Sequence, residues 1–149
     1  MSDGKYDLYD ANQLIGKTNH QPMNVSYITI IKDGAGVGRT RILPSNTMFI
    51  GTMGGLISKD SNLYFVNELL VKEDLSKKYS GSTIPHIYFK DYGSEIYSVP
   101  TLKEQTDIGN LFEIFDSLLT LHQREGSSYK VARDRMTRST SLFSSSWMM

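Results

Sequence analysis

Short apolar segments alternate with polar, turn-forming segments over the first hundred residues, as is typical of a chain built from short strands. Residues 25–31, VSYITII, are rich in β-branched and aromatic side chains, and both faces are largely apolar. This pattern predicts a strand that is covered on both sides. Residues 1–24 are polar and rich in turn formers, so strands are hard to place there. Further short strands are predicted at residues 39–43, 47–51, 53–58 and 94–99.

Two segments show helical spacing instead. Residues 62–74 place leucine and valine on one side of a helix, and Asp60 or Ser61 is expected to cap it. The second helix is expected to start at Pro100, because Thr101 with Glu104 three residues later forms a capping box. An apolar stripe then follows a coiled-coil spacing of three and four, with a histidine next in register. Its positions are Ile108, Leu111, Phe115, Leu118 and His122.

The stripe has two interpretations. It fits an ordinary amphipathic helix packed on its own domain, and it fits a coiled-coil arm that meets another helix. The periodicity stops after Glu125, and the remaining Ser- and Thr-rich segment lacks a stripe to bury. We therefore expect three regions, residues 1–99, 100–125 and a disordered tail at 126–149. The expected fold is α+β, with a twisted, mostly antiparallel sheet, one or two helices and a projecting C-terminal helix.

The amino-acid composition excludes several kinds of functional site. The 149 residues carry 16 basic and 16 acidic side chains and no cysteine, which excludes disulfides and thiolate sites and suits a reducing cytoplasm. Residues 1–126 hold 12 basic against 15 acidic residues, so a nucleic-acid-binding role must depend on local patches. No secretory signal or membrane span is evident. The three histidines lack metal-ligand spacing, and no nucleophile or base constellation stands out, so we expect no metal, no cofactor and no enzyme.

The glycine-rich stretch at residues 32–41, KDGAGVGRTR, is the motif most suggestive of chemistry. A phosphate-binding P-loop requires a first glycine where Asp33 stands, a lysine where Arg39 stands, and a helix afterwards. Because strand-forming residues follow instead, the stretch is interpreted as the tip of a hairpin. A nucleotide-binding loop over Gly34–Arg39 is the weaker alternative.

The flanks of this hairpin supply candidate anion-binding residues. Lys32, Arg39 and Arg41 bring three cations together, and alternation places the two arginines on one face. In the segment SGST, Ser82 and Thr83 offer hydroxyl groups that could bind phosphate. A solvated hairpin tip and a simple turn are the bland interpretations of these two sites.

Four motifs in order along the chain resemble the specificity subunit of type I restriction–modification enzymes. They are YITIIKDGAGVGRTR, IGTMGGLISKD, SGSTIPHIYFKDYG and SVPTLKEQTDIGNLFEIFDSLLTLHQRE. The last is the most specific, and an amphipathic helix alone gives little reason for its exact string. Its matching positions are Pro100, Leu102, Glu104, Gln105, Ile108, Gly109, Phe112, Asp116, Leu121, His122, Gln123 and Arg124.

The resemblance covers about residues 4–125 and implies a function. In that family each subunit has two target recognition domains that read halves of a DNA site. Long helices separate these domains and dock the methyltransferase subunits. The specificity subunit is not catalytic; its partners use S-adenosylmethionine for methylation, and ATP with magnesium for cleavage. The implied partners are double-stranded DNA, the methyltransferase subunit, the restriction subunit through the complex, and another specificity-subunit chain.

The chain also departs from the family pattern. The match starts in the middle of a recognition domain, a second recognition domain is absent, and the helix pattern stops at Glu125. We therefore expect a truncated specificity subunit that recognises DNA in the cytoplasm. The alternative is a silent cassette or remnant that docks on methyltransferase subunits without binding DNA.

Overall fold

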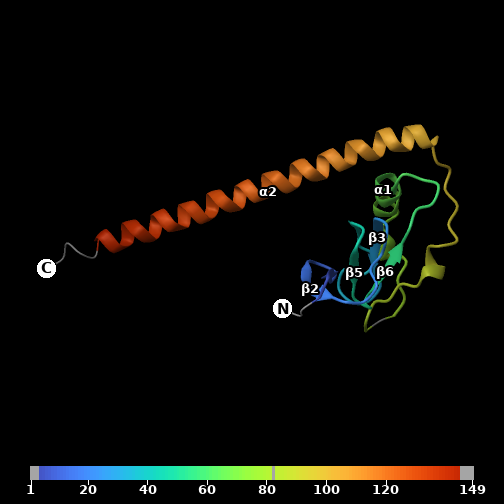
Figure 1. The fold of residues 1–149 in the computed structure, drawn as a ribbon, viewed down its shortest axis with the longest axis horizontal. Helices are drawn as coiled ribbons and strands as arrows, with labels where there is room; N and C mark the ends of the chain where they lie inside the picture. The colour runs from blue at the N-terminus through green and yellow to red at the C-terminus, as the bar shows by residue number, and fades with distance from the viewer. Residues whose placement is uncertain (1–3, 82, 145–149) are drawn as a thin grey trace. The chain divides into compact units, whose positions relative to one another are not determined.

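A computed structural model describes residues 4–81 and 83–144, with side chains as far as Ser128 and at Lys130. The chain divides into two compact units, residues 1–110 and residues 111–149, and each is described by itself. The first unit contains six strands and the short helix α1. Figure 1 shows the chain coloured from blue at the N-terminus to red at the C-terminus, with several of these strands and both helices α1 and α2 labelled. The long helix α2 begins in the first unit and supplies the described part of the second.

The strands form two three-stranded sheets. The first sheet has the order β2 (Leu14–Thr18), β1 (Tyr6–Tyr9), β5 (Thr47–Phe49), and the second has the order β4 (Thr40–Leu43), β3 (Tyr27–Ile31), β6 (Met53–Leu56). The pairing of β1 with β5 is parallel, and the other three pairings are antiparallel. The expected α+β class with mostly antiparallel pairing is confirmed, although two sheets are found where one was expected.

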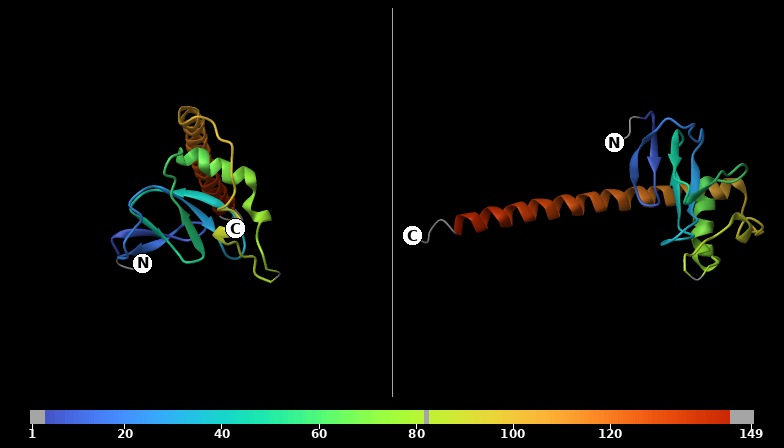
Figure 2. Two further views of the ribbon diagram at one scale, coloured as in Figure 1. Left: turned by 90° about the vertical axis from the view of Figure 1, so that its right-hand side faces the viewer. Right: turned by 90° about the horizontal axis from the view of Figure 1, so that it is seen from below.

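The strand β3 is the centre of the core. All five of its residues are buried, as the two apolar faces of VSYITII predicted. Helix α1 (Leu63–Glu73) packs on β3 and β4, as Figure 2 shows, and the 3₁₀ turn η1 (Leu75–Lys77) follows it. The core cluster joins residues far apart in sequence, which makes the glycine hairpin and the loop before α2 part of the core. Its buried members are Ile28, Ile30, Val37, Leu70, Leu75 and Ile87.

Side chains of Tyr27 and Thr47 connect the two sheets. The Tyr27 hydroxyl lies 3.0 Å from Thr47 Oγ1, and the Tyr27 and Phe49 ring centroids are 5.6 Å apart. Burial raises the pKa of Tyr27 above its ordinary value, while the bond to Thr47 opposes that shift. Because both hydroxyl-bearing residues are buried, their mutual hydrogen bond removes the cost of leaving either group unpaired.

Two sequence expectations about strands are wrong. Residues 1–24 do contain strands, since β1 and β2 form a hairpin around a turn in which Asp10 accepts bonds from Asn12 N (2.7 Å) and Gln13 N (2.7 Å). Their faces are only partly buried, so the apolar alternation that signals a strand is weak. Residues 94–99 are not a strand, although their side chains alternate. Ile96 is 95% exposed, and the segment pairs with no strand among the described residues.

The start of helix α2 (Leu102–Ser144) explains part of the motif that resembles the specificity subunit. The capping box is confirmed, with Thr101 N donating to Glu104 Oε2 (3.0 Å) and Glu104 N donating to Thr101 Oγ1 (3.4 Å). Gln105 is buried; it donates to the Pro100 carbonyl (2.9 Å) and accepts from Asn62 N (3.2 Å). These bonds fasten the first turn of α2 to the start of α1.

Gly109 is required for the same close approach. A Cβ atom at this position would overlap the side chain of Asn62. Asn62 caps α1 by accepting from Phe65 N (3.0 Å), so it is the cap where Asp60 or Ser61 was expected. The glutamate, glutamine and glycine of the motif thus cap α2, bond to α1 and make room for the cap of α1.

Helix α2 continues to Ser144, past the boundary at Glu125 where the sequence pattern stops. Helix formation does not require an apolar stripe, and the segment after Gly126 contains no proline or glycine before Ser144. The structure therefore differs from the expected disordered tail at residues 126–144, which are helical. Residues 145–149 of that expected tail lie outside the described residues.

Candidate functional site

The glycine-rich stretch is a hairpin between β3 and β4, as the sequence predicted. Gly34, Gly36 and Gly38 have φ of 79°, 87° and 83°, a region that favours glycine. Most of the backbone N–H groups that a phosphate would need are already used within the protein. The bonds are Gly34 N to Pro85 O (3.0 Å), Val37 N to Gly34 O (3.1 Å), Gly38 N to Ile31 O (2.8 Å) and Arg39 N to Gly36 O (3.0 Å).

Arg39 and Arg41 both reach the turn between β1 and β2. Arg39 Nη2 donates to the Ala11 carbonyl (2.8 Å) and to Asn12 Oδ1 (2.6 Å), and Arg41 Nη1 donates to the Asn12 carbonyl (3.2 Å). The Arg41 guanidinium also lies 5.0 Å from the Tyr9 ring centroid. These contacts tie the second sheet to the first, so each arginine has a structural role besides its charge.

The same turn contains an acid whose charge is stabilised. Backbone N–H groups of Gln13 and Asn12 lower the pKa of Asp10, and the Arg41 charge adds to this effect. The carboxylate is therefore held in its ionised form, which keeps the turn ordered and partly offsets the positive charge of Arg41.

Lys32 differs from the two arginines. Its backbone N–H donates to Thr52 O (2.9 Å) and its carbonyl accepts from Ile87 N (3.0 Å), so its backbone is fixed. Its side chain passes close to Gly54, and no carboxylate in the described part of the chain lies within ion-pair distance. Its ammonium group is thus a better candidate for an external anion than either arginine.

The loop before α2 lies directly against the glycine hairpin. Gly34 N bonds to Pro85 O and Ile87 N to Lys32 O, while His86 pairs with Ser80 through two backbone bonds (2.8 and 2.9 Å). The His86 Nδ1 atom also contacts the carboxylate of Asp33. The hairpin and the loop therefore form one continuous surface, which the sequence did not reveal.

Of the two hydroxyl residues expected to bind phosphate in this loop, the structure describes one. Thr83 is exposed near the tip of the loop, and Ser82 lies outside the described residues. Residues 32–41 and 77–92 hold six of the twelve lysines and arginines of positions 1–126. Two of them, Lys77 and Lys78, are ion-paired with Asp74 (2.9 Å) and Glu95 (2.6 Å). The other four, Lys32, Arg39, Arg41 and Lys90, have no ion pair in the described part of the chain, and they lie on two segments that the fold brings together.

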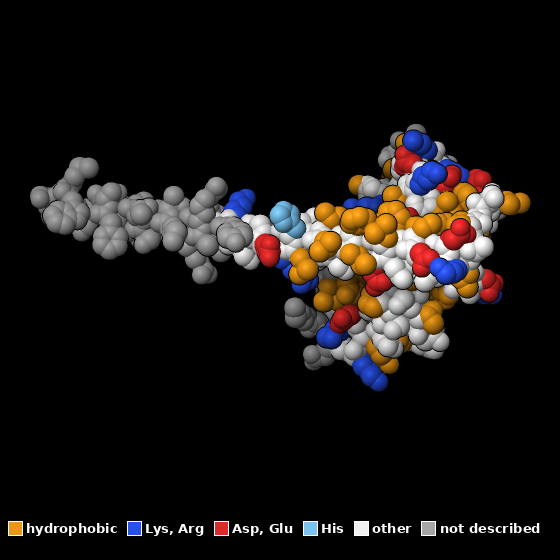
Figure 3. Space-filling view, turned by 90° about the horizontal axis from the view of Figure 1, so that it is seen from above, with side chains coloured by type: hydrophobic (Ala, Val, Ile, Leu, Met, Phe, Trp, Pro, Cys, Tyr) orange, Lys and Arg blue, Asp and Glu red, His pale blue; other side chains and the backbone are white. Residues whose placement is uncertain are grey.

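The helix stripe is exposed along α2. Figure 3 shows hydrophobic side chains following one another along this helix. Leu111 and Phe115 are 51% and 50% exposed, Ile108 and Leu118 are also exposed, and His122 continues the stripe. Ile114, Leu119 and Leu121 are exposed as well, and at about 100° per residue the apolar positions span about half of the helix circumference.

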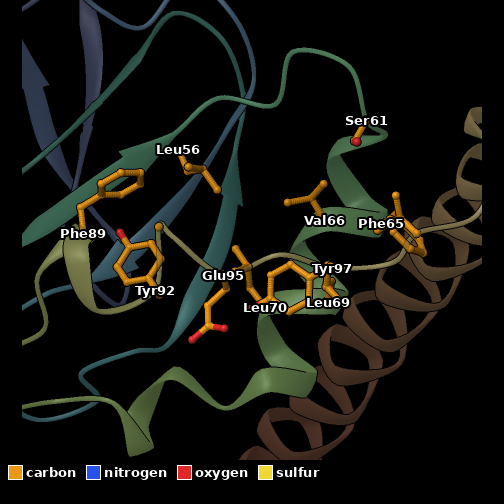
Figure 4. A pocket seen from close by; sticks show the side chains of 12 residues that line it. Leu56, Ser61, Phe65, Val66, Leu69, Leu70, Phe89, Tyr92, Glu95 and Tyr97 are labelled. Atoms are coloured by element: carbon orange, nitrogen blue, oxygen red, sulfur yellow. The ribbon is translucent and has the colours of Figure 1, made fainter.

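A hydrophobic cavity of about 300 Å³ lies in the first unit, beside α1. Figure 4 shows its side chains, among them the aromatic residues Phe65, Phe89, Tyr92 and Tyr97. The Tyr97 hydroxyl is buried without a hydrogen-bond partner in the described structure. Burial raises the pKa of Tyr97, so its hydroxyl stays neutral. The lining is mainly apolar, and the Glu95 carboxylate within it is ion-paired with Lys78 (2.6 Å).

No group of His, Asp or Glu side chains among those that the structure describes, which extend to Ser128 and include Lys130, is arranged to hold a metal ion. No helix among the residues described is both long enough and apolar enough to cross a membrane.

The chain resembles a protein of known structure. A solved structure, the S subunit of a type I restriction–modification system from M. genitalium, superposes with a TM-score of 0.57 at 23% sequence identity. The match covers 77% of this chain and 32% of that protein, so this chain spans about a third of its length. It shows that the fold is shared. No curated protein matches the chain in sequence.

A sequence model of a protein family also matches the chain. The model of the type I restriction modification DNA specificity domain matches residues 2–127, which include both sheets, α1 and the start of α2. The expected resemblance is thereby confirmed, over nearly the range that the motifs indicated. The chain belongs to the family of type I restriction modification DNA specificity domains.

Proposed function

We propose that this chain recognises a DNA sequence for a type I restriction–modification complex in the cytoplasm, without catalysing a reaction. The family assignment supports this function, and the observation that carries it is the joining of the hairpin to the loop, which brings together four cations without an ion pair in the described part of the chain. They are Lys32, Arg39, Arg41 and Lys90. Cations would anchor the phosphates, while polar groups such as the Thr83 hydroxyl would approach base edges. The neighbouring Ser82, outside the described residues, belongs to the same proposal.

The three hairpin cations have different contacts within the protein, so we propose different roles for them. Lys32 has no acidic partner in the described part of the chain, so its ammonium group would contact a phosphate directly. Arg39 and Arg41 would share their guanidinium groups between DNA and the turn at Asn12. Removing Lys32 should therefore weaken DNA binding alone, whereas removing an arginine should also lower stability.

The experiment measures affinity for a mixed-sequence DNA duplex over a series of salt concentrations. The variant Lys32→Ala should lower the log–log salt slope by about 0.9, the value of one phosphate contact. Arg39→Lys should keep the slope but lose stability, because the flexible ammonium lacks the planar guanidinium whose Nη2 holds the Ala11 carbonyl and Asn12 Oδ1 in fixed directions. Unchanged slopes in Lys32→Ala and in a Lys32→Ala/Arg39→Ala/Arg41→Ala variant would show that DNA does not bind at this hairpin.

The exposed face of α2 is proposed as the partner surface. Ile108, Leu111, Phe115 and Leu118 form an apolar seam with His122 in register, and contiguous exposed seams mark association sites. An apolar face that spans about half of the circumference can contact more than one helix. The proposed partners are the methyltransferase subunit and a helix of another specificity-subunit chain, with the restriction subunit joining through the complex.

This second proposal is tested by replacing Leu111 and Phe115 with aspartate. Because both side chains are half exposed, the variant should keep the melting temperature of the parent and lose co-purification with the methyltransferase subunit. A matched control replaces Glu113 and Asp116, which lie on the same turns, with glutamine and asparagine. If the aspartate variant instead unfolds the first unit, the stripe belongs to the core of the domain.

The two alternatives lead to different measurements. A fragment that docks on methyltransferase subunits without reading DNA would co-purify with them and show no DNA affinity. A nucleotide-binding protein would release heat on titration with ATP, which we do not expect because the hairpin N–H groups are already bonded.

A further inference from the structure

A row of contacts extends the DNA-facing surface beyond the hairpin. The Asp33 carboxylate contacts His86 Nδ1, the His86 and Tyr88 ring centroids lie 4.1 Å apart, and Lys90 Nζ lies 5.3 Å from the Tyr88 centroid. These successive contacts connect Asp33 of the hairpin to the Lys90 ammonium through two aromatic rings. An acid, an imidazole, a phenol ring and a cation thus contact one another in succession, with the two rings tilted at 55°.

The geometry points to Tyr88 and Lys90 as a second DNA contact, held beside the glycine hairpin by the Asp33–His86 pair. This inference rests on the proposed DNA-binding function. Tyr88 is 51% exposed and Lys90 is exposed, so both can reach a phosphate. The nearby Asp91 keeps its negative charge, but its carboxylate is held at the start of η2 (Phe89–Asp91), where it accepts from Tyr88 N (2.7 Å).

The position of this contact depends on His86. Its backbone bonds to Ser80, and its neighbour Ile87 is fully buried in the core, so the loop is anchored at its base. The side chains of His86 and Asp33 remain 28% and 34% exposed, which places their contact at the edge of the surface. We therefore assign Asp33 and His86 as positioning residues, which act on DNA through Tyr88 and Lys90.

Lys5 provides a matched control. Its Nζ atom lies 5.3 Å from the Tyr6 ring centroid, the same separation as in the Lys90–Tyr88 pair. The turn after β1 begins at Asp10 and contacts the hairpin arginines, whereas Lys5 precedes β1 at its other end. The five residues from Lys5 to Asp10 span about 17 Å at roughly 3.3 Å per strand residue. Lys5→Ala removes an equivalent lysine–tyrosine contact away from the proposed surface.

The first experiment measures binding of the full chain to a mixed-sequence DNA duplex at increasing salt. Lys90→Ala should lower the log–log slope by about 0.9 and weaken binding about eightfold at about 0.1 M salt. Lys5→Ala should leave both values unchanged. If the parent binds DNA and Lys90→Ala keeps the parental slope, this inference is wrong and the proposed function stands. If the parent binds no DNA, both are wrong.

The second experiment tests the positioning role through Asp33. Asp33→Asn and Asp33→Ala both remove a negative charge, but only asparagine keeps an acceptor for His86. We expect Asp33→Ala to lose the same slope as Lys90→Ala, the double variant to lose no more, and Asp33→Asn to retain the slope. If both Asp33 variants tighten binding equally, the acid acts only by its charge and the positioning role is overturned. Melting curves check that each Asp33 variant is folded. The comparison of Lys90→Ala with Lys5→Ala does not depend on the Asp33 variants.

Discussion

Replacing Gly38 with alanine gives the sharpest test of how the hairpin is packed. A Cβ atom at this position would lie within 3.0 Å of backbone atoms of Leu75 and Ser76, and backbone atoms cannot rotate away. The positive φ of 83° adds about 1–2 kcal/mol for a residue with a Cβ atom, and overpacking adds about 1–3 kcal/mol. We expect Gly38→Ala to lower the free energy of unfolding by about 2–5 kcal/mol.

Gly34→Ala is the control for the backbone cost alone. Its φ is 79°, nearly that of Gly38, but no heavy atom lies within 4 Å of the added Cβ atom. It should therefore cost about 1–2 kcal/mol. Urea unfolding followed by circular dichroism gives both values on one scale. Equal losses in the two variants would refute the close contact between the hairpin and η1.

Three further predictions concern the rest of the chain. Because the pKa of Asp10 is lowered, the stability that it contributes should be present above its ordinary value of 3.8 and should be lost as the pH falls through the lowered value; in acid titrations of unfolding, Asp10→Asn should show a shallower loss. Gln105→Ala should cost about 1–3 kcal/mol in urea unfolding, because it leaves Asn62 N and the Pro100 carbonyl without their partner, whereas exposed Lys103→Ala should stay within about 0.5 kcal/mol. Deleting residues 127–149 should leave the melting temperature of the first unit unchanged, since the sequence there has no apolar stripe to bury; a large decrease would show that the segment packs.

Local sequence determined the elements whose signals are contained within a few residues. The β-branched run of β3, the capping box at Thr101 and the three glycines of the hairpin each specify a local backbone geometry. The two wrong strand predictions concern segments whose structure depends on distant parts of the chain. The hairpin of β1 and β2 is stabilised by Arg39 of the glycine hairpin and Arg41 of β4, and residues 94–99 alternate but pair with no strand of the described chain. A strand requires a partner, and the identity of that partner is not encoded in its own alternation.

The family could be recognised from ordered motifs, and the cations of the hairpin could be named from sequence alone. The tertiary structure decided which of them have other tasks, because it shows Arg39 and Arg41 bonded to the turn at Asn12 while Lys32 stays unpaired with any acid of the described chain. It also brought the loop of His86 onto the hairpin across a separation of 53 residues. Long-range hydrogen bonds and burial of Ile87 fix that arrangement, and neither leaves a periodic signal in the sequence.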